Sequence, residues 1–212
     1  MQNVKFIGIT QRLVENASYV ERRECLSVEW GRFFRSEPLC SYMPLPLSYE
    51  IPFESYMPLL SAIILSGGND LYSCNANPLS YQRDDYEKRI IENAIKTKIP
   101  LLGVCRGAQL IAEYFGSELQ SCCGHIGVHS VDLVNDFWGG LKKAEVNSFH
   151  QFCITQLGKE LRPLAFGADK TIEAFKHHNL PIFAILWHIE REEVLCEVSC
   201  KILQQSFLTK EY

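Results

Sequence analysis

Short apolar runs and amphipathic segments alternate along most of this 212-residue chain. Apolar runs with the length of buried strands occur at residues 5–10, 61–65, 99–104 and 181–187. Helical spacing of apolar and polar positions predicts helices at residues 19–35, 83–97, 108–115 and 190–205. Strands that alternate with helices in this way predict a parallel sheet covered by helices on both faces.

Further strands are expected outside this alternation. Residues 41–47 predict a short strand at a sheet edge, because Pro44 and Pro46 cannot donate ladder hydrogen bonds. Residues 129–134 alternate between polar and apolar, and residues 164–174 add another strand candidate. The sequence therefore predicts an α/β fold of three layers, with a mostly parallel central sheet, flanking helices and a small β extension. We expect a single domain over residues 1–212.

Composition narrows the class of protein. The chain is 47% hydrophobic and 22% charged, with a net charge of −4, so nothing attracts it as a whole to nucleic acid or an anionic membrane. No apolar run approaches the ~20 residues that span a bilayer. The first residues show no signal-peptide pattern, and we expect a cytoplasmic protein without nucleic-acid or membrane partners. A homo-oligomer is compatible with this composition.

Nine cysteines are present, an odd number without any C-x-x-C pair. We interpret most of them as small buried hydrophobes in a reducing compartment. A zinc site built from Cys122, Cys123, His125 and His129 is the alternative, but that spacing matches no common structural zinc pattern. We therefore expect no metal site.

Cys105 lies in the most informative segment of the chain. It ends an apolar run, has a glycine two residues away on either side, Gly103 and Gly107, and is followed at once by a helical pattern. Strand, sharp turn and helix form a nucleophile elbow, which exposes one side chain above the end of a sheet. The helix N-terminus there favours thiolate over thiol. The alternative is a buried cysteine that merely ends a strand.

A thiolate nucleophile needs a base, and the base needs a group that orients it. His188 closes the last apolar run, and Glu190 follows two positions later. On extended backbone, residues i and i+2 project to the same side, so Glu190 can hold the His188 imidazole. The alternative is an ordinary histidine beside an acidic residue at a helix start.

Several segments resemble the class I glutamine amidotransferase superfamily, in its branch of stand-alone γ-glutamyl hydrolases of the peptidase C26 type. The resemblance runs in chain order through residues 5–10, 65–70, 83–87, 102–111, 146–150, 168–174 and 187–188. It implies the class I glutamine amidotransferase-like, or flavodoxin-like, version of the three-layer fold. Two departures stand out: Ile189 lies where the family has proline, and Gln151 lies where a second histidine is common.

The resemblance also implies roles for individual residues. Cys105 would be the nucleophile, His188 the general base and acid, and Glu190 the orienting carboxylate. Backbone N–H groups of Gly68 and Arg106 would form the oxyanion hole. The glutamyl head group would be held by Gln109, Ser148, Phe149 and His150. No metal or organic cofactor is needed for this chemistry.

The leaving group decides the substrate, which is a small γ-glutamyl amide. Arg12 follows the first strand, and Arg22, Arg23, Arg32 and Arg35 follow it along the chain. These arginines form either a solvated face or a pocket for an anionic leaving group such as a phosphate. The resemblance favours a nucleotide-linked substrate. Alternatives are another γ-glutamyl amine such as γ-glutamyl-aminobutyrate, a glutaminase subunit that needs a synthetase partner, and an inactive binding module.

Overall fold

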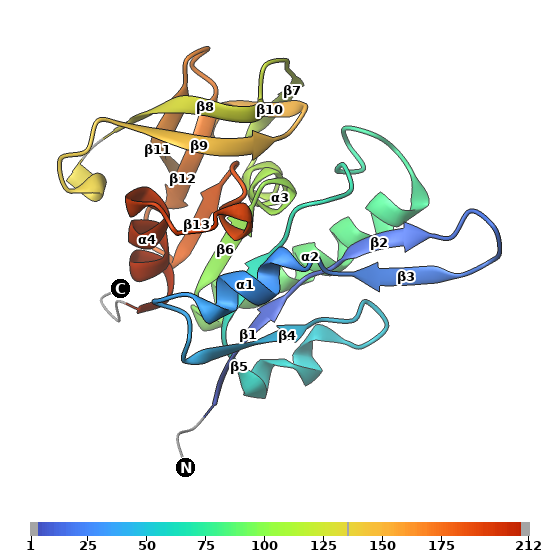
Figure 1. Ribbon diagram of the computed structural model, residues 1–212. Helices are drawn as coiled ribbons and strands as arrows, with labels where there is room; N and C mark the ends of the chain where they lie inside the picture. Colours follow the sequence, from blue (N-terminus) through green and yellow to red (C-terminus); the bar gives the residue numbers. More distant parts are fainter. Residues whose placement is uncertain (1–3, 135, 209–212) are drawn as a thin grey trace.

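Parallel strands form one half of the main sheet. The computed structural model describes residues 4–134 and 136–208. The parallel strands lie in the order β4-β1-β5-β6-β13 (Figure 1). Their bounds are β4 Tyr42–Pro46, β1 Lys5–Ile9, β5 Leu60–Leu65, β6 Leu101–Val104 and β13 Ile182–Ile185. The predicted strands at residues 5–10, 61–65, 99–104 and 181–187 are thus confirmed, and the strand at residues 41–47 lies at the sheet edge as expected.

Antiparallel strands continue the same sheet beyond β13, in the order β12-β11-β8-β9. Their bounds are β12 Ile172–His177, β11 Leu161–Gly167, β8 Ile126–Leu133 and β9 Lys143–Phe149. Two further strands, β7 Glu118–Ser121 and β10 Phe152–Gln156, pair with each other, and β10 also pairs with β12. The β extension is therefore larger than predicted. The single strand expected at residues 164–174 is two strands, because the chain turns at Lys170, where φ is 69°.

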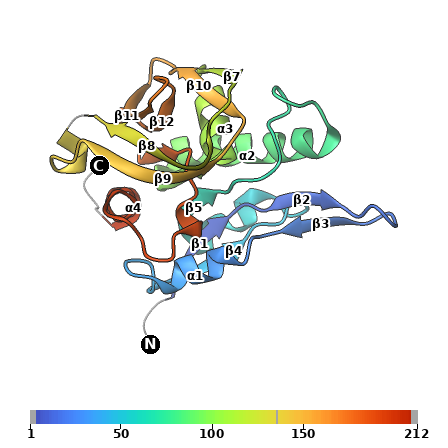
Figure 2. The same ribbon diagram turned by 45° about the horizontal axis from the view of Figure 1, so that its top comes forward.

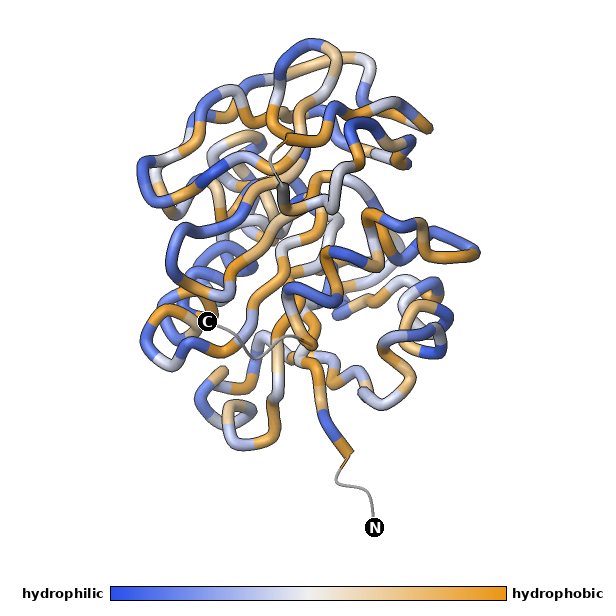
Figure 3. The backbone as a smooth tube through the Cα atoms, turned by 90° about the vertical axis from the view of Figure 1, so that its left-hand side faces the viewer, coloured by the Kyte–Doolittle hydropathy of each residue, from blue (hydrophilic) through white to orange (hydrophobic). Residues whose placement is uncertain are grey.

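Helices cover both faces of the sheet, as Figure 2 shows. One face packs against α2 Pro78–Thr97 and α3 Arg106–Tyr114, and the other against α1 Glu29–Arg35 and α4 Glu197–Leu203. Successive residues of a strand point to opposite faces. In β5, Ile64 joins the core under α1 and α4, whereas Ile63 and Leu65 join the core under α2 and α3. Figure 3 shows the hydrophobic segments along these central strands.

Short helical turns complete the described elements. Their bounds are η1 Phe53–Ser55, η2 Met57–Leu59, η3 Asp136–Trp138, η4 Ile189–Arg191 and η5 Gln204–Leu208. Among the described residues, no helix is both long enough and apolar enough to cross a membrane.

Two predicted helices are wrong in extent. Residues 19–35 form only the short helix α1, because β3 Arg22–Cys25 pairs with β2 Arg12–Glu15 in a projecting hairpin (Figure 1). The Asn69 side chain fixes this hairpin by bonding both the N–H and the carbonyl of Leu13. Residues 190–205 become helical in α4 only from Glu197, because η4 holds the chain close to the sheet. Long-range pairing overrides local periodicity in the first case.

The glycines around Cys105 are required by close packing. A Cβ on Gly103 would lie 2.8 Å from the backbone nitrogen of Ala108, and one on Gly107 only 2.1 Å from the carbonyl oxygen of Leu65. Neither glycine has a positive φ, so the constraint is the approach of α3 to β5 and β6 rather than backbone conformation. This approach sets the height of α3 above the sheet.

We predict that Gly107→Ala destabilises the protein by about 1–3 kcal/mol or more, because the backbone of β5 cannot yield to the added methyl group. Gly31→Ala is the matched control, since Gly31 is also helical but has no atom within 4 Å of the point that a Cβ would occupy. That variant should be neutral or stabilised by up to about 1 kcal/mol. Urea unfolding of both variants checks the prediction, and equal stabilities would contradict it.

Candidate active site

Cys105 lies in a strained turn between β6 and α3. Its φ of 52° and ψ of −106° place a residue with a side chain in a rarely populated backbone region. The turn is held from both sides: the Cys105 N–H donates to the carbonyl of Ile185 at 2.8 Å, and its carbonyl accepts from Gln109 at 3.1 Å. The predicted elbow is therefore present, and it directs the buried thiol above the carboxyl end of the parallel sheet.

His188 follows β13, the neighbour of β6 in the sheet. Its Nδ1 lies 2.6 Å from Oε1 of Glu190, and both side chains are buried. The backbone of His188 is fixed by Asn147, whose carbonyl accepts from the His188 N–H at 2.9 Å and whose side chain donates to the His188 carbonyl at 3.1 Å. With Nδ1 bonded to Glu190, Nε2 is the ring nitrogen left for Cys105. Ile189 does not prevent this pairing.

The electrostatics of His188 favour its protonated form. Burial by itself lowers the pKa of this imidazole, but hydrogen bonding with Cys105 and with Glu190 outweighs burial and raises the pKa to about 9. An imidazolium next to a sulfur is the arrangement that stabilises a thiolate. The sequence-predicted trio thus forms one connected unit in the structure.

The Gly67-Gly68 loop after β5 borders the same space. A Cβ on Gly67 would lie 3.0 Å from Cε1 of His188 and 3.5 Å from Cβ of Cys105. Gly68 has a φ of 95°, and a Cβ there would meet Cδ of Arg12 at 2.9 Å. Arg106 is the first residue of α3, where backbone N–H groups lack intrahelical acceptors. Backbone donors of Gly68 and Arg106 therefore lie on either side of the sulfur's environment.

A buried ionic network supports this loop, and sequence reasoning assigned it no role. The Arg83 guanidinium donates to the carbonyls of Ser66 at 2.8 Å and Gly67 at 3.0 Å, and to Glu87 at 2.9 Å. Arg106 forms ion pairs with Glu87 and Asp84. Despite burial, Arg106 and Arg83 keep the pKa of Glu87 below its usual value. The available signal was charge on the α2 face that packs against the sheet.

A cavity of about 280 Å³ joins these features. Its lining includes the predicted residues Arg12, Gly68, Cys105, Arg106, Gln109 and His188, together with residues 149–152. The Phe149 carbonyl oxygen lies 4.0 Å from Sγ of Cys105, and the Gln109 amide donates to the Phe152 carbonyl at 2.8 Å. Residues far apart in the sequence thus form one concave site at the ends of β1, β5, β6 and β13.

Two of the expected substrate contacts are placed differently from the others. Ser148 is fully buried behind the cavity wall, in a bridge with Trp187. His150 borders the cavity but is 5% exposed, and its ring lies against Glu173. Phe149 is the exposed member of this segment.

The predicted arginine group is divided by the hairpin. Arg12 lines the cavity, whereas Arg23 pairs with Glu21 and Arg22 bonds Gln82. Arg191 is a cavity residue that sequence reasoning missed; its guanidinium lies 5.3 Å from the centre of the Phe149 ring. Arg12 and Arg191 also line a second cavity of about 340 Å³ beyond His188. Adjacency to Glu190 was the only available signal for Arg191.

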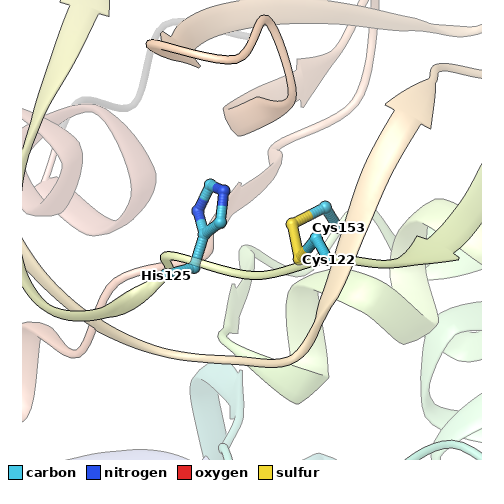
Figure 4. Close-up of side chains that lie close together, drawn as sticks. All are labelled: Cys122, His125 and Cys153. Carbon is cyan, nitrogen blue, oxygen red and sulfur yellow. A yellow bond between two sulfur atoms is a disulfide. The ribbon is translucent and has the colours of Figure 1, made fainter.

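The expectation for the cysteines is wrong. Cys25, Cys40 and Cys123 are exposed, and Cys105 is the buried free thiol among the described residues. Cys122 and Cys153 form a disulfide between the ends of β7 and β10, with Cα atoms 5.8 Å apart. Figure 4 shows His125 beside this disulfide. The set of Cys122, Cys123, His125 and His129 is therefore not assembled as one ligand group.

Comparison with known proteins agrees with this geometry. A family model described as peptidase C26 matches residues 7–190. A gamma-glutamyl-CDP-amidate hydrolase from Campylobacter jejuni is 51% identical over 207 residues, covering 97% of this chain and all of the relative. The glutamine-hydrolysing subunit of the GMP synthase from Pyrococcus furiosus is 31% identical over 107 residues, covering 49% of this chain and 57% of that protein.

Solved structures share the fold. A glutamine amidotransferase from Thermotoga maritima superposes with a TM-score of 0.65 at 21% identity, covering 90% of this chain and 77% of that chain. The predicted fold class is confirmed.

We predict that the pKa of His188 depends on both of its neighbours. In the folded protein it should be about 9, above the ordinary 6.5, so protonation of His188 stabilises the fold below pH 6.5 and this contribution is lost as pH rises through about 9. Cys105→Ala and Glu190→Gln should each lower this pKa, since each removes a negative partner. NMR titration of the ring measures it, with exposed His178 as internal control; an unchanged His188 pKa in both variants would contradict the pairing.

Proposed function

This chain belongs to the peptidase C26 family, and from that premise we propose that it hydrolyses the γ-glutamyl amide bond of γ-glutamyl-CDP-amidate. The observation that carries the proposal is the meeting of the Cys105 thiol, the His188 imidazole and the backbone donors of Gly68 and Arg106 at one cavity. The near full-length identity to a relative named for this substrate supports the choice of substrate.

In the first half of the proposed reaction, the Cys105 thiolate attacks the side-chain carbonyl carbon of the glutamyl group. The carbonyl oxygen becomes an oxyanion, which accepts hydrogen bonds from the N–H groups of Gly68 and Arg106. Removing one donor of this kind costs about 10²–10³ in rate in other enzymes. Protonated His188 then gives its proton to the leaving nitrogen, the C–N bond breaks and a γ-glutamyl thioester remains.

In the second half, His188 acts in the opposite direction. Neutral Nε2 takes a proton from water, whose oxygen attacks the thioester carbonyl, and the C–S bond breaks to return the thiolate and release glutamate. Glu190 keeps Nδ1 protonated and the ring oriented throughout, as the 2.6 Å contact indicates. Every step uses side chains and water, so the proposed reaction needs no cofactor.

The leaving group is an anion on the proposed substrate, a cytidine diphosphoramidate. Arg12 and Arg191 lie at the two cavities that meet beside His188, and both are suited to phosphate oxygens. We place the glutamyl group in the cavity at Cys105 and the diphosphate between these arginines. The reaction belongs in the cytoplasm, and its product would serve modification of a capsular polysaccharide.

A second candidate function is that of a glutaminase subunit that passes ammonia to a synthetase. The partial match to the glutamine-hydrolysing part of a GMP synthase favours it, because that relative hydrolyses glutamine. A hydrolase of γ-glutamyl-aminobutyrate is the third candidate.

We predict that glutamate release is at least ~10³-fold more efficient, in kcat/KM, with γ-glutamyl-CDP-amidate than with glutamine or γ-glutamyl-aminobutyrate, a difference of about 4 kcal/mol in transition-state binding. The three substrates are compared side by side with the purified chain. Cys105→Ala should abolish turnover of all three and keep the native circular dichroism spectrum. Comparably slow rates on all three substrates would favour the glutaminase role instead.

We predict that Arg12→Met raises KM for γ-glutamyl-CDP-amidate about tenfold or more and leaves KM for glutamine unchanged, because methionine keeps the apolar stem over Gly68 but removes the charge. Arg32→Met, on the exposed face of α1, is the matched control and should change neither constant. Equal effects of Arg12→Met on both substrates would remove the anionic subsite from the proposal.

A further inference from the structure

Three histidines surround one fully buried carboxylate in the antiparallel half of the sheet. Glu173 in β12 has no exposed surface. Its Oε1 lies 2.9 Å from Nδ1 of His125 and 3.5 Å from Nε2 of His150, and its Oε2 lies 3.6 Å from Nε2 of His129. His125 precedes β8, His129 lies in β8, and His150 follows β9. The proposed reaction uses none of these contacts.

The outer partners of two histidines fix where their protons are. Nε2 of His125 lies 2.9 Å from the Asp169 carboxylate, and Nδ1 of His150 lies 3.2 Å from the Phe152 carbonyl. Both partners only accept hydrogen bonds, so these two nitrogens are the donors. In the neutral rings, the other nitrogen is then a lone pair. Those lone pairs, at Nδ1 of His125 and Nε2 of His150, are the atoms next to Glu173.

Lone pairs that face a carboxylate in a buried site repel it unless a positive charge lies between them. Both Glu173 oxygens, Nδ1 of His125, Nε2 of His150 and both nitrogens of His129 are buried and have no hydrogen-bond partner among the described residues. Leaving such a group unsatisfied costs about 1–3 kcal/mol, and more when it is charged. So many unsatisfied atoms converging on one point indicate a missing cation.

We propose that His125, His150 and Glu173 bind a divalent transition-metal ion, with His129 as the fourth ligand. One nitrogen or oxygen from each of the first three lies within 4.8 Å of the others. In a tetrahedral zinc site with bonds of about 2.0–2.1 Å, ligand atoms are about 3.3 Å apart, close to the 3.5 and 3.6 Å separations here. Imidazole ligands select zinc and its neighbours over magnesium and calcium.

The outer hydrogen bonds of the cluster have the form that metal-binding histidines need. A ligating imidazole usually donates its other N–H to a carboxylate or a backbone carbonyl, which fixes the tautomer and the ring orientation. Asp169 and the Phe152 carbonyl provide one of each here. The ion would link β8, β12 and the segment at residues 149–152, which forms a wall of the proposed active-site cavity. Its role there is structural, since Cys105 is not among the ligands.

A shared proton is the competing explanation for the same geometry. The Glu173 carboxylate raises the pKa of His125 to about 9 against the effect of burial. Protons on His125 and His150 would also remove the lone-pair conflict. A metal ion and a proton compete for the same atoms, so the two explanations differ in whether the folded chain takes up metal at neutral pH.

The test is metal binding by the full chain after removal of metals with a chelator. Titration with Co²⁺ at pH 7.5 should give visible d–d absorption typical of tetrahedral coordination and saturate at one ion per chain. Zn²⁺ should displace Co²⁺ and raise the melting temperature. Glu173→Gln should weaken binding at least ~100-fold, since even the loss of a partner that only orients a ligand costs 10–100-fold. His178→Ala, an exposed histidine outside the cluster, is the control and should bind as the parent does.

His129→Gln is a second variant in case Glu173→Gln does not fold, because the His129 side chain is 18% exposed. Its metal-free circular dichroism should be native and its Co²⁺ affinity reduced. The titration is run with and without a reductant, because the disulfide cysteines Cys122 and Cys153 form an overlapping set with His125. Equal binding in both supports the histidine–carboxylate site. Binding only after reduction, no stoichiometric uptake, or uptake unaffected by both variants would overturn it.

Discussion

The arrangement of the candidate site depends on the buried ionic network of Arg83, Glu87, Arg106 and Asp84. Arg83 holds the carbonyls of the Gly67 loop, and the acidic residues of α2 hold Arg106 at the start of α3. Removing one member of a buried pair typically costs about 3–5 kcal/mol, because its partner is left charged and unpaired. The network therefore fixes the spacing between the Gly67-Gly68 loop and the strained turn at Cys105.

Packing under the turn acts in the same direction. The close approach of Gly107 to Leu65 presses α3 onto β5, and the hydrogen bond from Cys105 to Ile185 ties the turn to the end of β13. His188 lies three residues after Ile185, so the same strand end that supports the thiol also carries the imidazole. The positive φ of Cys105 is maintained by these contacts on both sides.

Local sequence reasoning succeeded where chemistry is concentrated in a short segment. The elbow at Cys105 and the spacing of His188 and Glu190 need only strand and turn geometry, and both are present in the structure. It failed for the hairpin of β2 and β3, whose pairing is stabilised by Asn69, more than forty residues away. Arg191 was missed because a single arginine after a short helical turn carries no periodic signal.

By itself, the sequence determined the alternation of buried strands and helices, the order of the parallel strands' functional ends, and the identity of the reactive side chains. Apolar runs and glycine spacing are local properties, so these features are readable from the chain. Only the tertiary structure decided which polar groups meet in the interior, as with Arg83 at the Gly67 loop and three histidines at Glu173. Such meetings depend on strand register and helix position, which are set by long-range packing that no local pattern records.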